Sequence, residues 1–146
     1  MREILFKAKT TKKDNPKHEF SEKWVEGNLI LCGEKAYIHP TSNKIGTTGE
    51  IARIIVLHEV IPNTICQYTG LTDKNGKKIW ENDIVRRTDL YVVSEPSVGF
   101  IKYDLENTSF LIHWTDKVEY SPTHYWKDRL EVIGNIFDNA DLLEVE

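Results

Sequence analysis

The sequence predicts a mainly β protein with the architecture of a barrel or a sandwich. β-Branched and aromatic residues gather in short runs, and Gly, Asn, Asp and Pro separate these runs at the spacing typical of such folds. No long segment has the apolar periodicity of an amphipathic helix. In chain order, the runs predicted as strands are Glu3–Ala8, Trp24–Leu31, Lys35–His39, Ile51–Val60, Thr64–Tyr68, Ile84–Arg87, Ser97–Asp104, Ser109–Trp114 and Leu130–Phe137.

A tight hairpin is predicted near the middle of the chain. Asp73-Lys74-Asn75-Gly76 lies between the runs 68–71 and 79–80, and Asn-Gly supplies the positive φ angles that a short connection requires. The pair Asp73 and Asn75 also begins like a calcium loop, but the third oxygen ligand and the distal Glu are missing. The glycine spacing, and a lysine in place of Ser or Thr, likewise exclude a phosphate-binding P-loop. A hairpin turn is the better interpretation of this segment.

A second hairpin and a loop are predicted in the C-terminal half. Residues 104–107 link the alternating runs 98–103 and 109–114, and the second run places three apolar residues on one face, Phe110, Ile112 and Trp114. His113 falls on the opposite face, where a solvated or hydrogen-bonded histidine is expected rather than a metal ligand. Gly99 and Gly134 suit corner or bulge positions. The polar segment 115–129 is predicted to be a long loop.

Composition limits the class of protein. A chain of 146 residues is one domain or two very small ones, and it can bury a core without disulfides or metals. The formal net charge of −4 argues against a protein whose main task is to neutralise phosphates. No apolar run is long enough for a signal peptide or a membrane span, so a cytoplasmic protein is expected. Cys32 and Cys66, each beside an apolar residue, are predicted to be buried thiols.

One long motif resembles a known family. Residues 67–85 read Gln-Tyr-Thr-Gly-Leu-Thr-Asp-Lys-Asn-Gly-Lys-Lys-Ile-Trp-Glu-Asn-Asp-Ile-Val. This segment is similar to the pattern of the YopX-like family of phage and prophage proteins, and residues 2–6, 24–30 and 131–143 resemble other parts of that family. Asn82 stands where the family has Gly and Ala140 where it has Pro, and the tryptophan that the family has after the opening strand is missing near Lys9. Asn tolerates left-handed backbone, so the turn at Asn82 is expected to remain.

The resemblance implies a fold and a biological context. It implies an N-terminal β region over residues 1–62 and a C-terminal SH3-like small barrel over residues 63–146, compatible with packing as one compact unit. The short alternating runs of the second part agree with a small barrel. The family consists of uncharacterised proteins without established catalytic residues, so the resemblance implies an accessory protein in the cytoplasm of a bacterial host. It implies no reaction.

Basic and aromatic residues in the C-terminal half form the predicted binding surface. Small barrels bind single-stranded nucleic acid or extended peptides through aromatic platforms with cations nearby. Residues 77–87 carry a local excess of positive charge, although most aromatic rings are expected in the core. The candidate binding residues are Lys77, Lys78, Trp80, Arg86, Arg87 and Trp126, with Trp80 or Trp126 exposed.

These observations favour a non-enzymatic binding module that contacts a protein or a single-stranded nucleic acid. The alternative is a structural or assembly protein that forms homo-oligomers through strand edges and through its basic N-terminal and acidic C-terminal segments. An enzyme is less favoured, because no catalytic constellation is evident; Glu81 and Asp83 share a strand face, but Asp83 is better explained as a partner of turn amides. No cofactor and no metal ion is expected.

Overall fold

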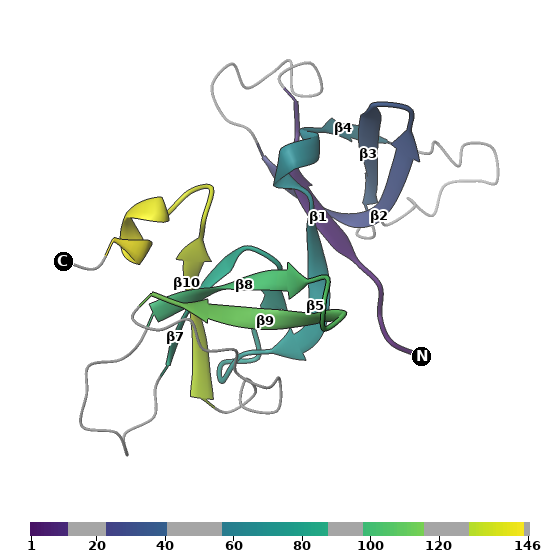
Figure 1. Ribbon diagram of the computed structural model, residues 1–146. Helices are drawn as coiled ribbons and strands as arrows, with labels where there is room; N and C mark the ends of the chain where they lie inside the picture. Colours follow the sequence, from purple (N-terminus) through teal and green to yellow (C-terminus); the bar gives the residue numbers. More distant parts are fainter. Residues whose placement is uncertain (12–22, 41–56, 88–97, 116–128, 145–146) are drawn as a thin grey trace. The chain divides into compact units, whose positions relative to one another are not determined.

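The computed structural model describes residues 1–11, 23–40, 57–87, 98–115 and 129–144 (Figure 1). In these residues the chain is mainly β, as the sequence predicts, with short 3-10 helices. Its contacts divide it into two units: Met1 with Glu3–Gln67, here called unit 1, and Arg2 with Tyr68–Glu146, called unit 2. The division falls inside one strand, a little beyond the boundary predicted at 62/63. No helix of the described part is long and apolar enough to cross a membrane.

Unit 1 is built on an antiparallel sheet. Its strands are β1 (Phe6–Lys9), β2 (Trp24–Cys32), β3 (Lys35–Pro40) and β4 (His58–Val60), in the order β4-β3-β2-β1. The first residues of β5 (Cys66–Thr72) pair with the free side of β1. One face of the sheet holds a small core of fully buried residues, Ala8, Ala36, Ile38 and Val60.

Unit 2 contains the rest of β5, which pairs with β6 (Lys78–Trp80), and a second antiparallel sheet. This sheet consists of β7 (Asp83–Arg87), β8 (Val98–Asp104), β9 (Ser109–Trp114) and β10 (Leu130–Asn135), in the order β10-β7-β8-β9. The 3-10 helix η4 (Ala140–Leu143) follows it. The core lies on the inner face and contains Ile79, Val85, Ile101, Ile112, Leu130 and Val132. The pairing recorded for the described residues does not join β9 to β10, so a closed SH3-like barrel is not confirmed.

Local sequence signals place several strands well and others less well. The strand 109–114 has the predicted bounds, and β2, β3 and β7 differ from the prediction by one residue at an end. β8 agrees with the prediction over 98–104, and the predicted first residue, Ser97, lies outside the described residues. The strand predicted at Glu3–Ala8 is the shorter strand Phe6–Lys9, and the strand predicted to end at Phe137 ends at Asn135. The strand predicted at 64–68 is displaced to Cys66–Thr72, because Pro62 begins the 3-10 helix η2 (Pro62–Thr64). The Thr64 hydroxyl donates to the Ile61 carbonyl over 2.7 Å and stabilises that turn. Of the run predicted at 51–60, only 57–60 lies within the described residues.

The predicted hairpin at Asp73 is present, with a different turn. Gly76 has a φ of +79°, whereas Asn75 is not among the residues with positive φ. The N–H of Gly76 donates to the Asp73 carbonyl over 3.0 Å, and the N–H of Asp73 donates to the Lys77 carbonyl over 2.8 Å. This pattern is a β-turn followed by one left-handed residue, the usual form of a three-residue hairpin loop. Glycine is therefore required at one position only.

The turn between β6 and β7 explains why Asn82 is tolerated. Asn82 has a φ of 68°, which confirms the expected left-handed backbone. Its N–H donates to the Ile101 carbonyl and its carbonyl accepts from the Ile136 N–H, over 2.8 and 3.0 Å. The Asp83 carboxylate accepts the backbone N–H of Trp80 over 2.8 Å, the turn-amide role predicted for it. Asparagine is the best substitute for glycine at such a position.

The two glycines predicted at corner or bulge positions have different roles. The register of β10 shifts between Val132 and Gly134, so Gly134 lies at a bulge. A Cβ there would lie 2.5 Å from Oδ1 of Asn139, the oxygen that accepts the N–H of Asn135. Gly99 lies in regular pairing with β9, and a Cβ there would lie 2.5 Å from the His113 carbonyl oxygen. A close approach of strands therefore explains Gly99.

The two cysteines differ in exposure. Cys66 is buried and its thiol donates to the Thr64 carbonyl over 3.3 Å, as expected of a core thiol. Cys32 is exposed, so the prediction that it is buried is wrong. It lies opposite Lys35 in the last pair before the β2–β3 turn, where the strands run past the core. Even its neighbour Leu31 is 69% exposed, so an apolar neighbour did not indicate burial here.

Candidate binding surface

The structure places one of the two candidate tryptophans, Trp80, away from the expected surface. Trp80 is only 4% exposed, so the expectation of an exposed Trp80 is wrong. It lies opposite Tyr68 in the β5–β6 ladder, and the two ring centroids are 5.4 Å apart with their planes inclined by 49°. Trp80 ends a three-residue strand just before the left-handed turn, and its ring fills the space beside Tyr68 instead of projecting outwards. Trp126 lies outside the described residues.

The predicted cations do not form one continuous group. Lys77 is exposed in the hairpin turn, whereas Lys78 is half-buried with its Nζ 5.1 Å from the ring centroid of Tyr68. This distance is that of a cation–π contact. Arg86 and Arg87 are neighbours in β7, so their side chains point to opposite faces of the sheet. Of these four residues, only Arg86 lies on the outer face of the β10-β7-β8-β9 sheet.

Arg86 takes part in an ion pair across two strands. It lies directly opposite Glu131 in the β7–β10 ladder, and its guanidinium nitrogen is 2.6 Å from Oε2 of Glu131. The Lys74 ammonium lies 3.7 Å from the same oxygen. The hydrogen bond from Arg86 lowers the pKa of Glu131 below its ordinary value of 4.5, and the charge of Lys74 acts in the same direction. Partial desolvation and the charge of Asp73 oppose this shift.

This pKa shift predicts an acid-sensitive contribution to stability. A carboxyl whose pKa is lowered by folding stabilises the protein fully above its unfolded pKa, and the contribution is lost as the pH falls through the folded pKa. We therefore expect Glu131→Gln to lower the urea midpoint at neutral pH, and the difference from the parent chain to vanish as the pH falls well below 4.5. Urea unfolding followed by tryptophan fluorescence over this range measures it. The control variant Glu106→Gln changes an exposed turn residue, and its difference in urea midpoint from the parent chain should not depend on pH. If the difference in urea midpoint for Glu131→Gln stayed constant down to acid pH, the prediction would be contradicted.

The register of the sheet shows which residues share the outer face with Arg86. Side chains directly opposite each other in antiparallel strands lie on the same face, and alternate residues of one strand do so too. Arg86 is opposite Val98, and Phe100 is opposite both Ile84 and His113. Ile101 and Ile112 mark the other, inner face. Ile84 and Leu111 share the outer face and are 0% and 8% exposed, and the Phe100 and His113 rings above them are half-buried. The outer face therefore includes five residues with charged or ring side chains, Arg86, Phe100, Lys102, His113 and Glu131.

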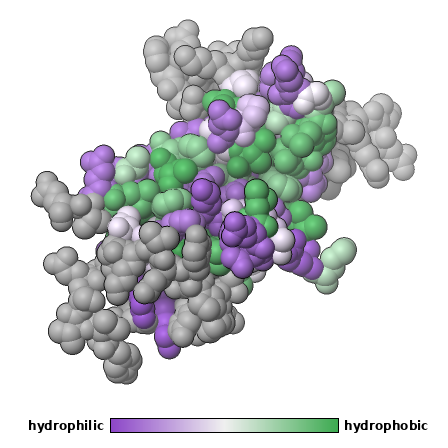
Figure 2. Space-filling model, in the orientation of Figure 1, coloured by the Kyte–Doolittle hydropathy of each residue, from purple (hydrophilic) through white to green (hydrophobic). Residues whose placement is uncertain are grey.

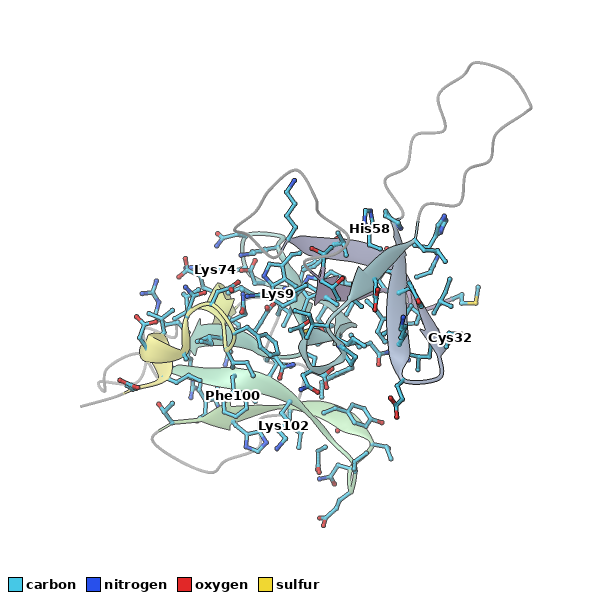
Figure 3. All side chains as sticks on the ribbon, turned by 90° about the horizontal axis from the view of Figure 1, so that it is seen from above. Lys9, Cys32, His58, Lys74, Phe100 and Lys102 are labelled. Carbon is cyan, nitrogen blue, oxygen red and sulfur yellow. The ribbon has the colours of Figure 1, made fainter. Side chains whose placement is uncertain are left out.

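Two rings and a cation lie together on this outer face. The rings of Phe100 and His113 are stacked, with centroids 5.3 Å apart and planes inclined by 20°. Lys102 is exposed and follows two residues after Phe100, and Figure 3 shows both residues on the same side of β8. Figure 2 shows apolar and hydrophilic side chains interspersed on the side of the molecule that it displays. On this outer face, the flat rings of Phe100 and His113 can stack on a planar ligand, and the Lys102 ammonium can bind an anion beside it.

Sequence reasoning named one residue of this face, Arg86, as a candidate binding residue and did not name the others. Arg86 was predicted from its type and its neighbours. The alternation that assigns Phe110, Ile112 and Trp114 to the core already places His113 on the opposite face. Applied to the run 98–103, the same alternation would have placed Phe100 and Lys102 with His113, so the signal was available.

Comparisons with known proteins agree with the architecture. The family model described as YopX protein matches residues 9–144. The crystal structure of protein EF1440 from Enterococcus faecalis is similar, with a TM-score of 0.55 and 22% sequence identity, covering 99% of this chain and 100% of that chain. At this identity the likeness shows the fold alone. No curated protein matches the chain.

Proposed function

We propose that this chain, which belongs to the YopX family, is a non-enzymatic binding module. In this proposal the outer face of the β10-β7-β8-β9 sheet contacts a macromolecule. The stacked pair Phe100 and His113 with exposed Lys102 beside it carries the proposal. The Arg86 side chain on the same face remains 43% exposed within its ion pair. The buried carboxylates of Asp73 and Asp83 accept backbone N–H groups, so a structural role accounts for them.

The proposal includes the finer expectations that follow from the resemblance. An SH3-like arrangement of residues 63–146 is supported by the meander β7–β8–β9 with β10 paired to the other side of β7. An accessory role in the cytoplasm of a bacterium that carries a phage or prophage is the corresponding biological proposal. The SH3-like arrangement and the accessory role are both parts of the proposal of a binding module, and neither implies a catalysed reaction.

Site-specific photo-crosslinking tests the proposal. Lys102, exposed on the outer face, is replaced by a photoreactive benzoylphenylalanine in cells that produce the full chain. We expect the probe at position 102 to form adducts with a partner, because its ring would lie within the contact. An adduct that nuclease shortens contains nucleic acid, and an adduct that nuclease leaves unchanged contains a protein partner.

A matched probe provides the control. Lys35 is exposed in β3 of unit 1, and a probe there should form no comparable adduct. No adduct from position 102, or equal adducts from both positions, would overturn the binding module. An adduct between two copies of this chain would instead favour the self-associating assembly protein.

A further inference from the structure

We propose that the outer face of the β10-β7-β8-β9 sheet binds single-stranded nucleic acid, with one base stacked beside Phe100 and His113 and adjacent phosphates bound by Arg86 and Lys102. This inference rests on the proposed function and names its ligand. The parallel rings come from β8 and β9, so the sheet itself holds them in place. Every base has a flat π-face, so a stacking platform of this kind accepts any sequence.

The cations lie on both sides of this platform along the strand. Phe100 and Lys102 are two residues apart in β8, which separates them by about 7 Å. Arg86 lies opposite Val98, two residues before Phe100, and therefore on the other side of the ring at a diagonal distance of about 7 to 8 Å. The order is cation, ring pair, cation. A nucleic acid strand that runs along β8 can place a base on the rings and its two flanking phosphates on the cations.

Charge makes this contact local and sensitive to salt. The chain has a net charge of −4, so the field of the whole protein does not attract a polyanion. Two phosphate contacts on single-stranded nucleic acid predict a slope of about −1.4 for log K against log salt concentration. Glu131 competes with a phosphate for Arg86, because its carboxylate is 2.6 Å from the guanidinium. Removing the charge of Glu131 should therefore strengthen binding.

Fluorescence anisotropy with a labelled oligodeoxythymidine of about 12 nucleotides tests the inference. The full chain is titrated between about 50 and 200 mM salt. We expect Lys102→Gln to weaken binding and to reduce the salt slope by about 0.7, since one phosphate contact is lost. Phe100→Leu should weaken binding about tenfold or more and leave the slope unchanged. Glu131→Gln should bind more tightly than the parent chain.

Controls separate binding from folding and from the proposed function. Lys35→Gln removes a lysine of unit 1 that is also exposed, and should leave affinity and slope unchanged. Lys102 is a surface residue, so its variant tests the inference even if Phe100→Leu is poorly folded. A dissociation constant larger than about 10⁻⁴ M at low salt would overturn the proposal of a nucleic acid ligand. An affinity that Lys102→Gln leaves unchanged would overturn it as well. A nuclease-resistant adduct from position 102 would then still support a binding module, with a protein partner.

Discussion

Gly27→Ala is expected to abolish the regular pairing of β2 with β3 and to unfold unit 1 under conditions in which the parent chain is folded. A Cβ on residue 27 would lie 1.9 Å from the carbonyl oxygen of His39, and 2.7 and 2.9 Å from His39 C and Pro40 Cα. All three atoms belong to the backbone of β3, so no side-chain rotation relieves the overlap. The strands must separate, and we expect a loss of about 3 kcal/mol or more. This is a large part of the stability of a small domain.

Chemical denaturation and amide hydrogen exchange of β2 and β3 measure the effect. Asn28→Ala changes the exposed neighbouring residue in the same strand and should shift the unfolding midpoint little. Gly33→Ala tests backbone conformation without steric overlap, because Gly33 has a φ of +61° and nothing lies within 4 Å of its Cβ position. We expect Gly33→Ala to lower the free energy of unfolding by about 1 kcal/mol. If Gly27→Ala unfolded at the same midpoint as Asn28→Ala, the close approach of the strands would be refuted.

Local patterns could be predicted from the sequence, whereas the long-range contact of Gly27 could not. The hairpin at Asp73 and the strand 109–114 depend on neighbours within a few residues, and both were predicted from local pattern. The role of Gly27 depends on Pro40 lying opposite it, which no local pattern encodes. Cys32 and Trp80 were misplaced for a related reason. Burial depends on where a strand ends relative to the core, and the residue type does not contain that information.

The candidate site shows the same limit. Arg86 was identified from its charge, but its partner Glu131 is 45 positions away, and only the register of β7 with β10 brings them together. From the sequence, the acidic C-terminal segment, which includes Glu131, was interpreted only as a charged end for the alternative of self-association. One of its members instead neutralises part of the predicted basic surface. Phe100 and Lys102 differ from these cases, because alternation along β8 alone would have placed them with His113.

Asp73→Ala is expected to destabilise unit 2 by about 3 kcal/mol or more, because three backbone N–H groups lose their acceptor. Asp73 is 3% exposed, and its Oδ1 accepts the N–H groups of Asn75 and Lys77, each over 2.9 Å. Its Oδ2 accepts the N–H of Val132 over 3.0 Å. The N–H of Lys74 also donates to the Leu130 carbonyl over 3.0 Å. The carboxylate therefore closes its own turn and attaches that turn to β10.

Asp73→Asn separates these two functions. The amide oxygen can still accept the two N–H groups of the turn, but the amide nitrogen then faces the Val132 N–H, and two donors cannot bond. We expect a smaller loss of stability than for alanine, with faster hydrogen exchange at Val132 and retained protection at Lys77. Asp104→Ala, in the β8–β9 turn, removes a carboxylate that accepts the N–H of Glu106 two residues ahead, and should cost about 1 kcal/mol. A loss for Asp73→Ala no larger than that for Asp104→Ala would show that the bond to Val132 contributes nothing. A larger loss of stability for Asp73→Ala than for Asp104→Ala would instead identify Asp73 as the residue through which the motif at 67–85 holds β10. The two bonded residues, Asp73 and Val132, are 59 positions apart in the chain.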